Sequence, residues 1–153
     1  MLSRRALSVS ECRDRLRDRE HGEADIDAAI ARLLETGGLD DKKLAAAYAR
    51  TAAEIKGRGR LRVIRELQAR GVAKGVAAEA VGDVFGDKDE RSLVSRALQK
   101  KLRHRAGRPL DAAEKGRLYQ YLMRQGFTPA VIVDSLRKLR GSGPSGNGDD
   151  EVE

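Results

Sequence analysis

The stretch ELQARGVAKGVAAEAVGDVFG, residues 66–86, sets the pattern of this chain, because two other stretches repeat it. They are RLRDREHGEADIDAAIARLLE at 15–35 and YLMRQGFTPAVIVDSLRKLRG at 121–141. Each has a leucine late in one helix, then a short turn, then apolar residues at helical spacing. The leucines are Leu16, Leu67 and Leu122. Their separations of 51 and 55 residues leave room for three short helices in each repeat.

Each turn holds a residue that we expect to fill the corner between the two helices: His21, Val72 and Phe127. The remaining helix of each unit precedes the pair, at about 40–56 in the second unit and about 89–106 in the third. In the first unit only Leu2–Leu7 is left for it, so we expect that helix to be short or truncated.

A three-helix unit of this size buries little core alone, so stacked neighbours complete it. We therefore predict an all-α fold of about nine helices, in tandem three-helix repeats that form an elongated, curved array. The scarcity of aromatic residues, 3% of the chain, favours helices over strands. A single compact helical bundle is the alternative. The predicted units are 1–39 (truncated), 40–87 and 88–140, followed by a disordered acidic tail at 141–153.

Local signals mark where helices begin and end. Ser8 with Glu11 and Asp111 with Glu114 predict capping boxes. Asp40 predicts a further cap, and Thr128-Pro129 places a cap before a proline at the first helical position. Glycines are expected at helix ends: Gly22, Gly37, Gly38, Gly71, Gly86 and Gly126. The run KGRGR at 56–60 predicts a break between two helices rather than a phosphate-binding loop, since no strand precedes it.

The net charge is +7, and the last 13 residues contain four acids and no base, which leaves +11 on the rest. A body this basic favours a polyanionic partner, either nucleic acid or an acidic protein surface. A merely soluble surface is the alternative. One hypothesis for the tail is that it folds back on the basic face and weakens binding; a passive tail is equally compatible with its composition.

Two predicted helices have a basic side. Over 58–71, we expect Leu61, Ile64 and Leu67 to form the apolar face, with arginines opposite. Over 92–105, the predicted apolar face comprises Leu93, Ala97, Leu98 and Leu102. The candidate partner-binding residues are Arg58, Arg62, Arg65, Arg96, Lys100, Lys101, Arg103 and Arg105.

The sequence favours no chemistry beyond binding. His21, His104 and the single cysteine, Cys12, have no metal-ligand spacing, and we interpret His21 and Cys12 as structural. No nucleophile–base pattern, cofactor motif, signal peptide or membrane span is predicted, so we expect a non-enzymatic, cytoplasmic protein. With so few aromatic rings, base stacking is not expected as a main binding mode.

Residues 33–72 are similar to the central pattern of the RecX family, which has a Gly-Leu-acid-acid turn, a helix ending near an aromatic residue, and a second helix ending in a basic residue and glycine. The matching residues are Gly38-Leu39-Asp40-Asp41, Ala47-Tyr48, Gly59, Ile64, Glu66-Leu67 and Arg70-Gly71-Val72. Residues 96–102 and 117–136 resemble its lysine-rich helix and its closing helix pair. The acidic tail lies outside this pattern.

The resemblance implies tandem three-helix repeats, binding in the groove of the RecA–DNA filament, and inhibition of RecA recombinase, ATPase and coprotease activity. It implies the RecA filament as partner, with possible contact to the DNA phosphate backbone. We also expect a monomer that binds no membrane, since no apolar run is long enough to span one. Two rival hypotheses stay open: a helix-turn-helix-like DNA-binding protein and a helical protein adaptor.

Overall fold

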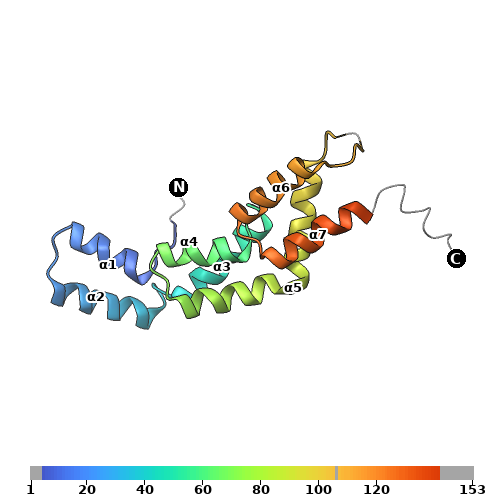
Figure 1. Ribbon diagram of the computed structural model, residues 1–153. Coiled ribbons are helices and arrows are strands. Elements are labelled where there is room, and N and C mark those ends of the chain that lie inside the picture. Colours follow the sequence, from blue (N-terminus) through green and yellow to red (C-terminus); the bar gives the residue numbers. More distant parts are fainter. Residues whose placement is uncertain (1–4, 106, 142–153) are drawn as a thin grey trace.

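The computed structural model describes residues 5–105 and 107–141, and within them every element is a helix. The helices are α1 (Val9–Asp18), α2 (Glu23–Thr36), α3 (Asp41–Glu54), α4 (Arg60–Ala69), α5 (Lys74–Lys101), α6 (Ala112–Gln125) and α7 (Pro129–Gly141). Figure 1 shows that they form an elongated, curved array, with the α1–α2 pair at one end. This confirms the predicted all-α fold of tandem repeats.

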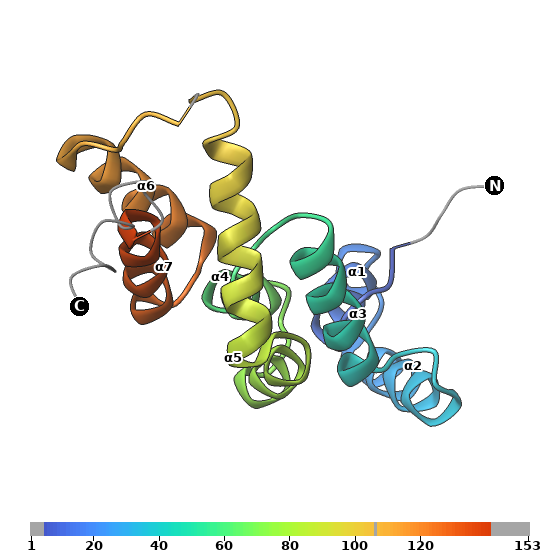
Figure 2. The ribbon, with the colours of Figure 1, turned by 90° about the vertical axis from the view of Figure 1, so that its right-hand side faces the viewer.

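Helix α5 consists of two helical segments that meet at Gly86, which has φ 45° and ψ 165°. Counted separately, they give eight helical segments in the described residues, close to the predicted nine. The difference lies in the first unit, because residues 5–8 are not helical and residues 1–4 lie outside the described residues. Figure 2 shows the second segment of α5 rising beside α6 and α7. The predicted acidic tail is also outside the described residues, apart from the backbone of Gly141.

The predicted helix starts are confirmed where a side chain caps the backbone. Ser8 and Asp111 form capping boxes with Glu11 and Glu114, and Asp40 accepts a hydrogen bond from the Lys43 N–H at 3.1 Å. These bonds satisfy N–H groups that lack a partner within the first helical turn. Gly22 is a correction, because it begins α2 as the N-cap and does not end the preceding helix.

The repeated turn has the same backbone geometry in all three units. The N–H groups of His21, Val72 and Phe127 donate to the carbonyls of Leu16, Leu67 and Leu122 at 3.2, 3.0 and 3.2 Å. The preceding residue is left-handed each time, with φ of 63° at Glu20, 89° at Gly71 and 94° at Gly126. Glutamate tolerates this conformation less well than glycine, so the first turn is the most strained of the three.

The side chains in these corners differ. Val72 and Phe127 are buried, as predicted, but His21 is exposed, so the expectation that it fills the first corner is wrong. The α1–α2 turn lies at the free end of the array (Figure 1), where no neighbouring unit packs against it. Cys12, which we interpreted as structural, is half-buried against the small core of the first unit.

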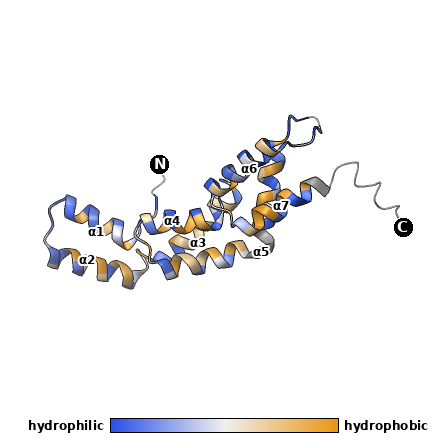
Figure 3. Ribbon diagram, viewed as in Figure 1, coloured by the Kyte–Doolittle hydropathy of each residue, from blue (hydrophilic) through white to orange (hydrophobic). Residues whose placement is uncertain are grey.

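Two hydrophobic cores hold the array together. The larger joins helices α3 to α7 and is centred on fully buried side chains such as Leu67, Phe85 and Phe127. The smaller belongs to the first unit and comprises Ile26, Ile30 and Leu39, with partly buried neighbours. Figure 3 shows that every helix carries hydrophobic and hydrophilic residues together, as expected for elements with one buried side.

The units join through the ends of their middle helices, which follow one another along the upper edge of Figure 1 in the order α1, α4, α6. At the start of α4, the N–H groups of Gly59 and Leu61 donate to the carbonyls of Gln125 and Gly126, at 2.7 and 2.9 Å. At the start of α1, Ser8 Oγ donates to the carbonyl of Arg70, which ends α4. Each junction therefore satisfies backbone groups that a helix end leaves without a partner.

A buried carboxylate fixes the third unit. Glu90, with 1% of its side chain exposed, follows the break at Gly86 and accepts hydrogen bonds from the N–H and hydroxyl of Thr128, at 3.1 and 2.9 Å. Its Oε1 also lies 3.4 Å from Arg60 Nε. Thr128 immediately precedes α7, so Glu90 ties together α4, α5 and α7. Negative charge at the start of a helix is favourable.

The junction between α4 and α6 predicts a specific glycine requirement. A Cβ at Gly126 would collide with the backbone nitrogen of Arg62, whereas a Cβ at Gly37, which also ends a 14-residue helix with positive φ, would meet open space. We expect Gly37→Ala to lower the free energy of unfolding by about 1 kcal/mol, from backbone strain alone. Gly126→Ala should lower it by about 3 kcal/mol, because overpacking adds to that strain. Urea denaturation measures both variants, and an equal decrease in the free energy of unfolding for the two would contradict this explanation.

The Glu90 contacts predict a graded series of stabilities. Glu90→Gln leaves buried donors poorly paired and should lower the free energy of unfolding by about 2 kcal/mol. Thr128→Val removes only the hydroxyl and should cost about 1 kcal/mol, whereas Thr128→Ser keeps it and should cost little. Chemical denaturation of the three variants measures the series. A Glu90→Gln variant as stable as the unmodified chain would show that the buried carboxylate is not needed.

Candidate functional site

The helix that carries the first predicted basic face, α4, buries a different side from the one that we expected. Val63 and Leu67 are fully buried in α4, whereas Leu61, which we expected on the apolar face, is 42% exposed. Ile64 is half-buried at the edge of the core. Neighbouring helix positions differ by about 100°, so the buried side is rotated by part of a turn from the predicted one.

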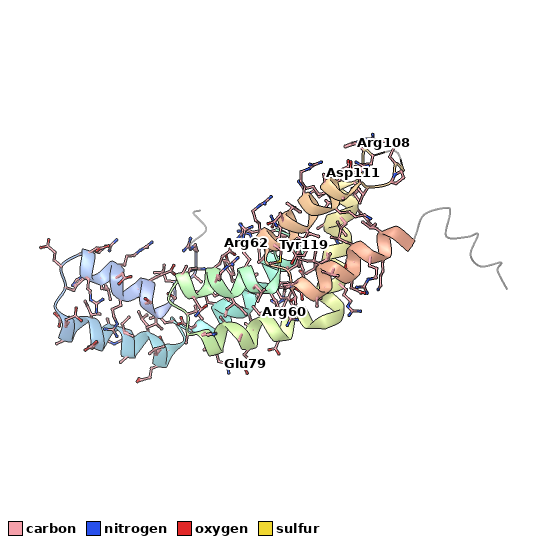
Figure 4. The ribbon with its side chains drawn as sticks, in the orientation of Figure 1. Arg60, Arg62, Glu79, Arg108, Asp111 and Tyr119 are labelled. Carbon is pink, nitrogen blue, oxygen red and sulfur yellow. The ribbon has the colours of Figure 1, made fainter. Side chains whose placement is uncertain are left out.

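Two arginines of that face are engaged within the protein. Arg58 and Arg62 both pair with Glu66, at 2.9 and 3.0 Å, and Tyr48 donates to the same carboxylate at 2.7 Å. Arg62 also donates to Gln125 Oε1 of α6 at 3.3 Å. Figure 4 shows Arg62 on the upper edge of the array, where α4 approaches α6. These contacts stabilise the junction between units and leave part of each guanidinium accessible.

The environment of Glu66 explains why it stays charged. Partial burial alone would raise the pKa of this carboxyl, but hydrogen bonds from Tyr48 and Arg62 and the charge of Arg58 outweigh that effect. The net result is a pKa below the ordinary glutamate value. Glu66 therefore neutralises much of the charge of the two arginines.

Arg65 is the one predicted residue of this face that points freely outward: it is exposed and makes no ion pair with any described residue. The second predicted face has more such residues. Arg96 and Lys100 of α5 are exposed, and so is Arg103, which lies just beyond the end of α5 at Lys101, where we expected the helix to continue.

The other two predicted residues of the third unit make internal contacts. Lys101 places its ammonium 4.2 Å from the centre of the Tyr121 ring, a cation–π contact that joins α5 to α6. Arg105 pairs with Glu114 and donates to the carbonyl of Pro109 at 3.0 Å, so it orders the connection to α6. This connection projects at the top of Figure 4, where Arg108 and Asp111 are labelled.

The first unit is held by a partly buried ion pair that sequence inspection missed. Arg70, at the end of α4, binds Glu11 of α1 through two hydrogen bonds of 2.8 and 3.0 Å. Its guanidinium also lies 5.8 Å from the centre of the Tyr48 ring. The bond from Arg70 is the main reason why the pKa of Glu11 falls to about 2, against the opposing effect of burial.

Two exposed arginines of α6, Arg117 and Arg124, were also missed. They lie seven residues apart and therefore on the same side of the helix. The helical spacing that indicates the exposed arginines of α4 also indicates this pair on α6. Within the described residues, no group of three metal-ligating side chains gathers, and no helix is long and apolar enough to cross a membrane.

Family models match the three units in turn: the second three-helix domain of RecX matches residues 40–81, the first matches residues 1–33, and the third matches residues 89–134. The chain belongs to the RecX family. The RecX assignment made from residue patterns is thereby confirmed, and the family is one of regulatory proteins.

Individual RecX proteins agree with this assignment. The regulatory protein RecX of Halorhodospira halophila is 33% identical over 128 residues, covering 84% of this chain and 76% of its own. RecX of Thermus thermophilus is 32% identical over 143 residues, covering 94% of this chain and 89% of its own. The crystal structure of RecX from Lactobacillus salivarius has the same fold, with a TM-score of 0.77 at 23% identity over 88% of this chain and 86% of that one.

The Glu11–Arg70 pair predicts an acid-sensitive contribution to stability. The folded pKa of Glu11 is below its unfolded value, so the stabilisation is full above about pH 5 and is lost as the pH falls toward 2. We expect Glu11→Gln to lower the free energy of unfolding by about 2 kcal/mol at pH 7 and by much less near pH 3. Urea denaturation of both proteins across this range measures the difference. A difference independent of pH would contradict the assignment to ionised Glu11.

Proposed function

We propose that this protein is a RecX-type regulator that binds along the groove of the RecA–DNA filament and inhibits RecA recombinase, ATPase and coprotease activity. Membership of the RecX family is the observation that carries this proposal. Action by binding alone, as a cytoplasmic monomer without a cofactor, is part of it. The proposed units are 1–39, 40–87 and 88–140.

The shape and charge of the molecule support a filament partner. An elongated array offers a long contact surface, and stacked repeats commonly bind along such surfaces (Figure 1). Four exposed basic residues are available for acidic RecA surface or DNA: Arg65 of α4, Arg96 and Lys100 of α5, and Arg103 just after α5. We assign Arg58, Arg62, Lys101 and Arg105 mainly to holding these helices in place.

The helix-turn-helix alternative receives less support. In such proteins the last helix of the unit enters the major groove and reads bases through its exposed side. In the second unit that helix is the first segment of α5, whose exposed residues include two acids, Glu79 and Asp83, and one base, Lys74, beside small residues. Figure 4 shows Glu79 on the lower edge, away from Arg62. Negative side chains there would repel DNA phosphates.

The proposal predicts inhibition of the ATPase activity of RecA on single-stranded DNA by the purified protein. We expect Arg65→Glu/Arg96→Glu/Lys100→Glu/Arg103→Glu to lower the inhibitory potency by about tenfold or more, because reversed charges repel an acidic partner. The matched control reverses Arg15, Arg19, Arg32 and Lys42, which changes the net charge equally on other exposed positions. Circular dichroism checks that both variants remain helical.

Two results would count against the proposal. Absence of inhibition by the unmodified protein at stoichiometric excess over RecA would refute it outright. Undiminished inhibition by the Arg65/Arg96/Lys100/Arg103 variant would remove these residues from the contact surface and favour an adaptor that binds through apolar side chains.

A further inference from the structure

Helices α4 and α6 together form one continuous ridge, because the start of α4 is bonded to the end of α6 through the Gly59 and Leu61 N–H groups. The inner sides of both helices are buried, through Val63 and Leu67 in α4 and through Leu118 and Leu122 in α6. Their outer sides therefore follow one another along the same edge of the array (Figures 1 and 4).

The outer side of this ridge is exclusively basic in its charged groups. The exposed residues of α6 include Arg117 and Arg124, and those of α4 include Arg65. None of the three makes an ion pair with another described residue. The two acids of these helices, Glu66 and Glu114, are partly buried and are paired with arginines. The ridge is thus a row of free guanidinium groups with the partly accessible Arg62 between them.

The row ends where α4 meets α1. The exposed residues of α1 include Asp14 and Asp18 beside Arg15 and Arg17, so its outer side has mixed charge. At 1.5 Å per residue, the span from Arg117 to Arg65 is roughly 25 Å. One strand of a DNA duplex places about seven phosphates over that length. The spacing of the arginines suits a track for a nucleic-acid backbone.

We infer that the outer side of α6 and α4 binds a DNA phosphate backbone through Arg117, Arg124 and Arg65. Guanidinium groups match phosphate oxygens in charge and in bidentate geometry. A protein partner is less suited to this ridge, because stable protein interfaces have an apolar centre with large anchoring side chains. Leu61 is the one large hydrophobic side chain exposed on α4, and α6 exposes none. The inference deepens the proposed function by assigning part of the basic surface to DNA. It rests on the proposed function only in taking the RecA–DNA filament as the place where the protein meets this DNA.

The test measures direct DNA binding by the full chain in the absence of RecA. Fluorescence anisotropy follows a labelled duplex of about 20 base pairs and a single strand of equal length, between about 50 and 200 mM salt. We expect Arg117→Glu/Arg124→Glu to weaken duplex binding by about tenfold or more and to reduce the slope of log K against log salt by about 2. The two probes distinguish duplex from single-stranded DNA as the preferred source of phosphates.

Arg15→Glu/Arg19→Glu is the matched control, since it reverses one exposed arginine of α1 and the exposed arginine directly after it, and changes the net charge equally. This control should bind like the unmodified chain. Equal loss in both variants would overturn the inference, because net charge alone would then explain binding. Arg117→Gln/Arg124→Gln, which introduces no new charge, should show a smaller loss in the same direction.

The RecA ATPase assay separates this inference from the proposed function. If the α6 variant keeps full DNA affinity but loses ATPase inhibition, the ridge contacts an acidic protein surface and the inference is wrong while the proposed function stands. If the variant loses DNA affinity and the unmodified protein does not inhibit RecA, the ridge assignment stands and the proposed function fails.

Discussion

The junction between consecutive middle helices is the contact on which the rest of the structure depends. The N–H groups that begin α4 bond to the carbonyls that end α6, so two helix ends satisfy each other without a side chain. This requires close backbone approach, and a Cβ at Gly59 would lie 2.5 Å from the Gly126 carbonyl carbon. The same junction orders the large core below it and aligns the outer sides of both helices above it.

Much of the fold was predictable, because its determinants are local. The Ser8–Glu11 and Asp111–Glu114 boxes lie within one helical turn, and the repeated leucine and turn give the same backbone bond in each unit. The contacts that were missed join distant residues: Glu11 with Arg70, Glu90 with Thr128, and Arg62 with Gln125. No spacing rule within a helix reveals such pairs, since they depend on how separate units stack.

The candidate binding residues likewise include features that local sequence predicts and features that depend on distant contacts. Helical periodicity correctly indicates that Arg96 and Lys100 of α5 are exposed, but it does not indicate that α5 ends at Lys101, before Arg103. It does not indicate which arginines meet a carboxylate from another turn or helix. Glu66 pairs with Arg58 and Arg62, and Glu114 pairs with Arg105. A basic face predicted from the sequence therefore contains both arginines that hold the fold together and arginines that are free to bind a partner. Only the folded arrangement separates the two kinds.

A network of polar side chains extends through all three units and includes several of the paired arginines. Glu11 of α1 binds Arg70, whose guanidinium lies against Tyr48; Tyr48 binds Glu66, and Arg62 links Glu66 to Gln125 of α6. Such partly buried, mutually bonded groups have few alternative partners, so each unit is held at a fixed angle to the next. A partner with regularly spaced charges, whether a filament surface or a phosphate backbone, is matched only if the exposed arginines keep their separation. The paired arginines therefore contribute to recognition by positioning the unpaired ones.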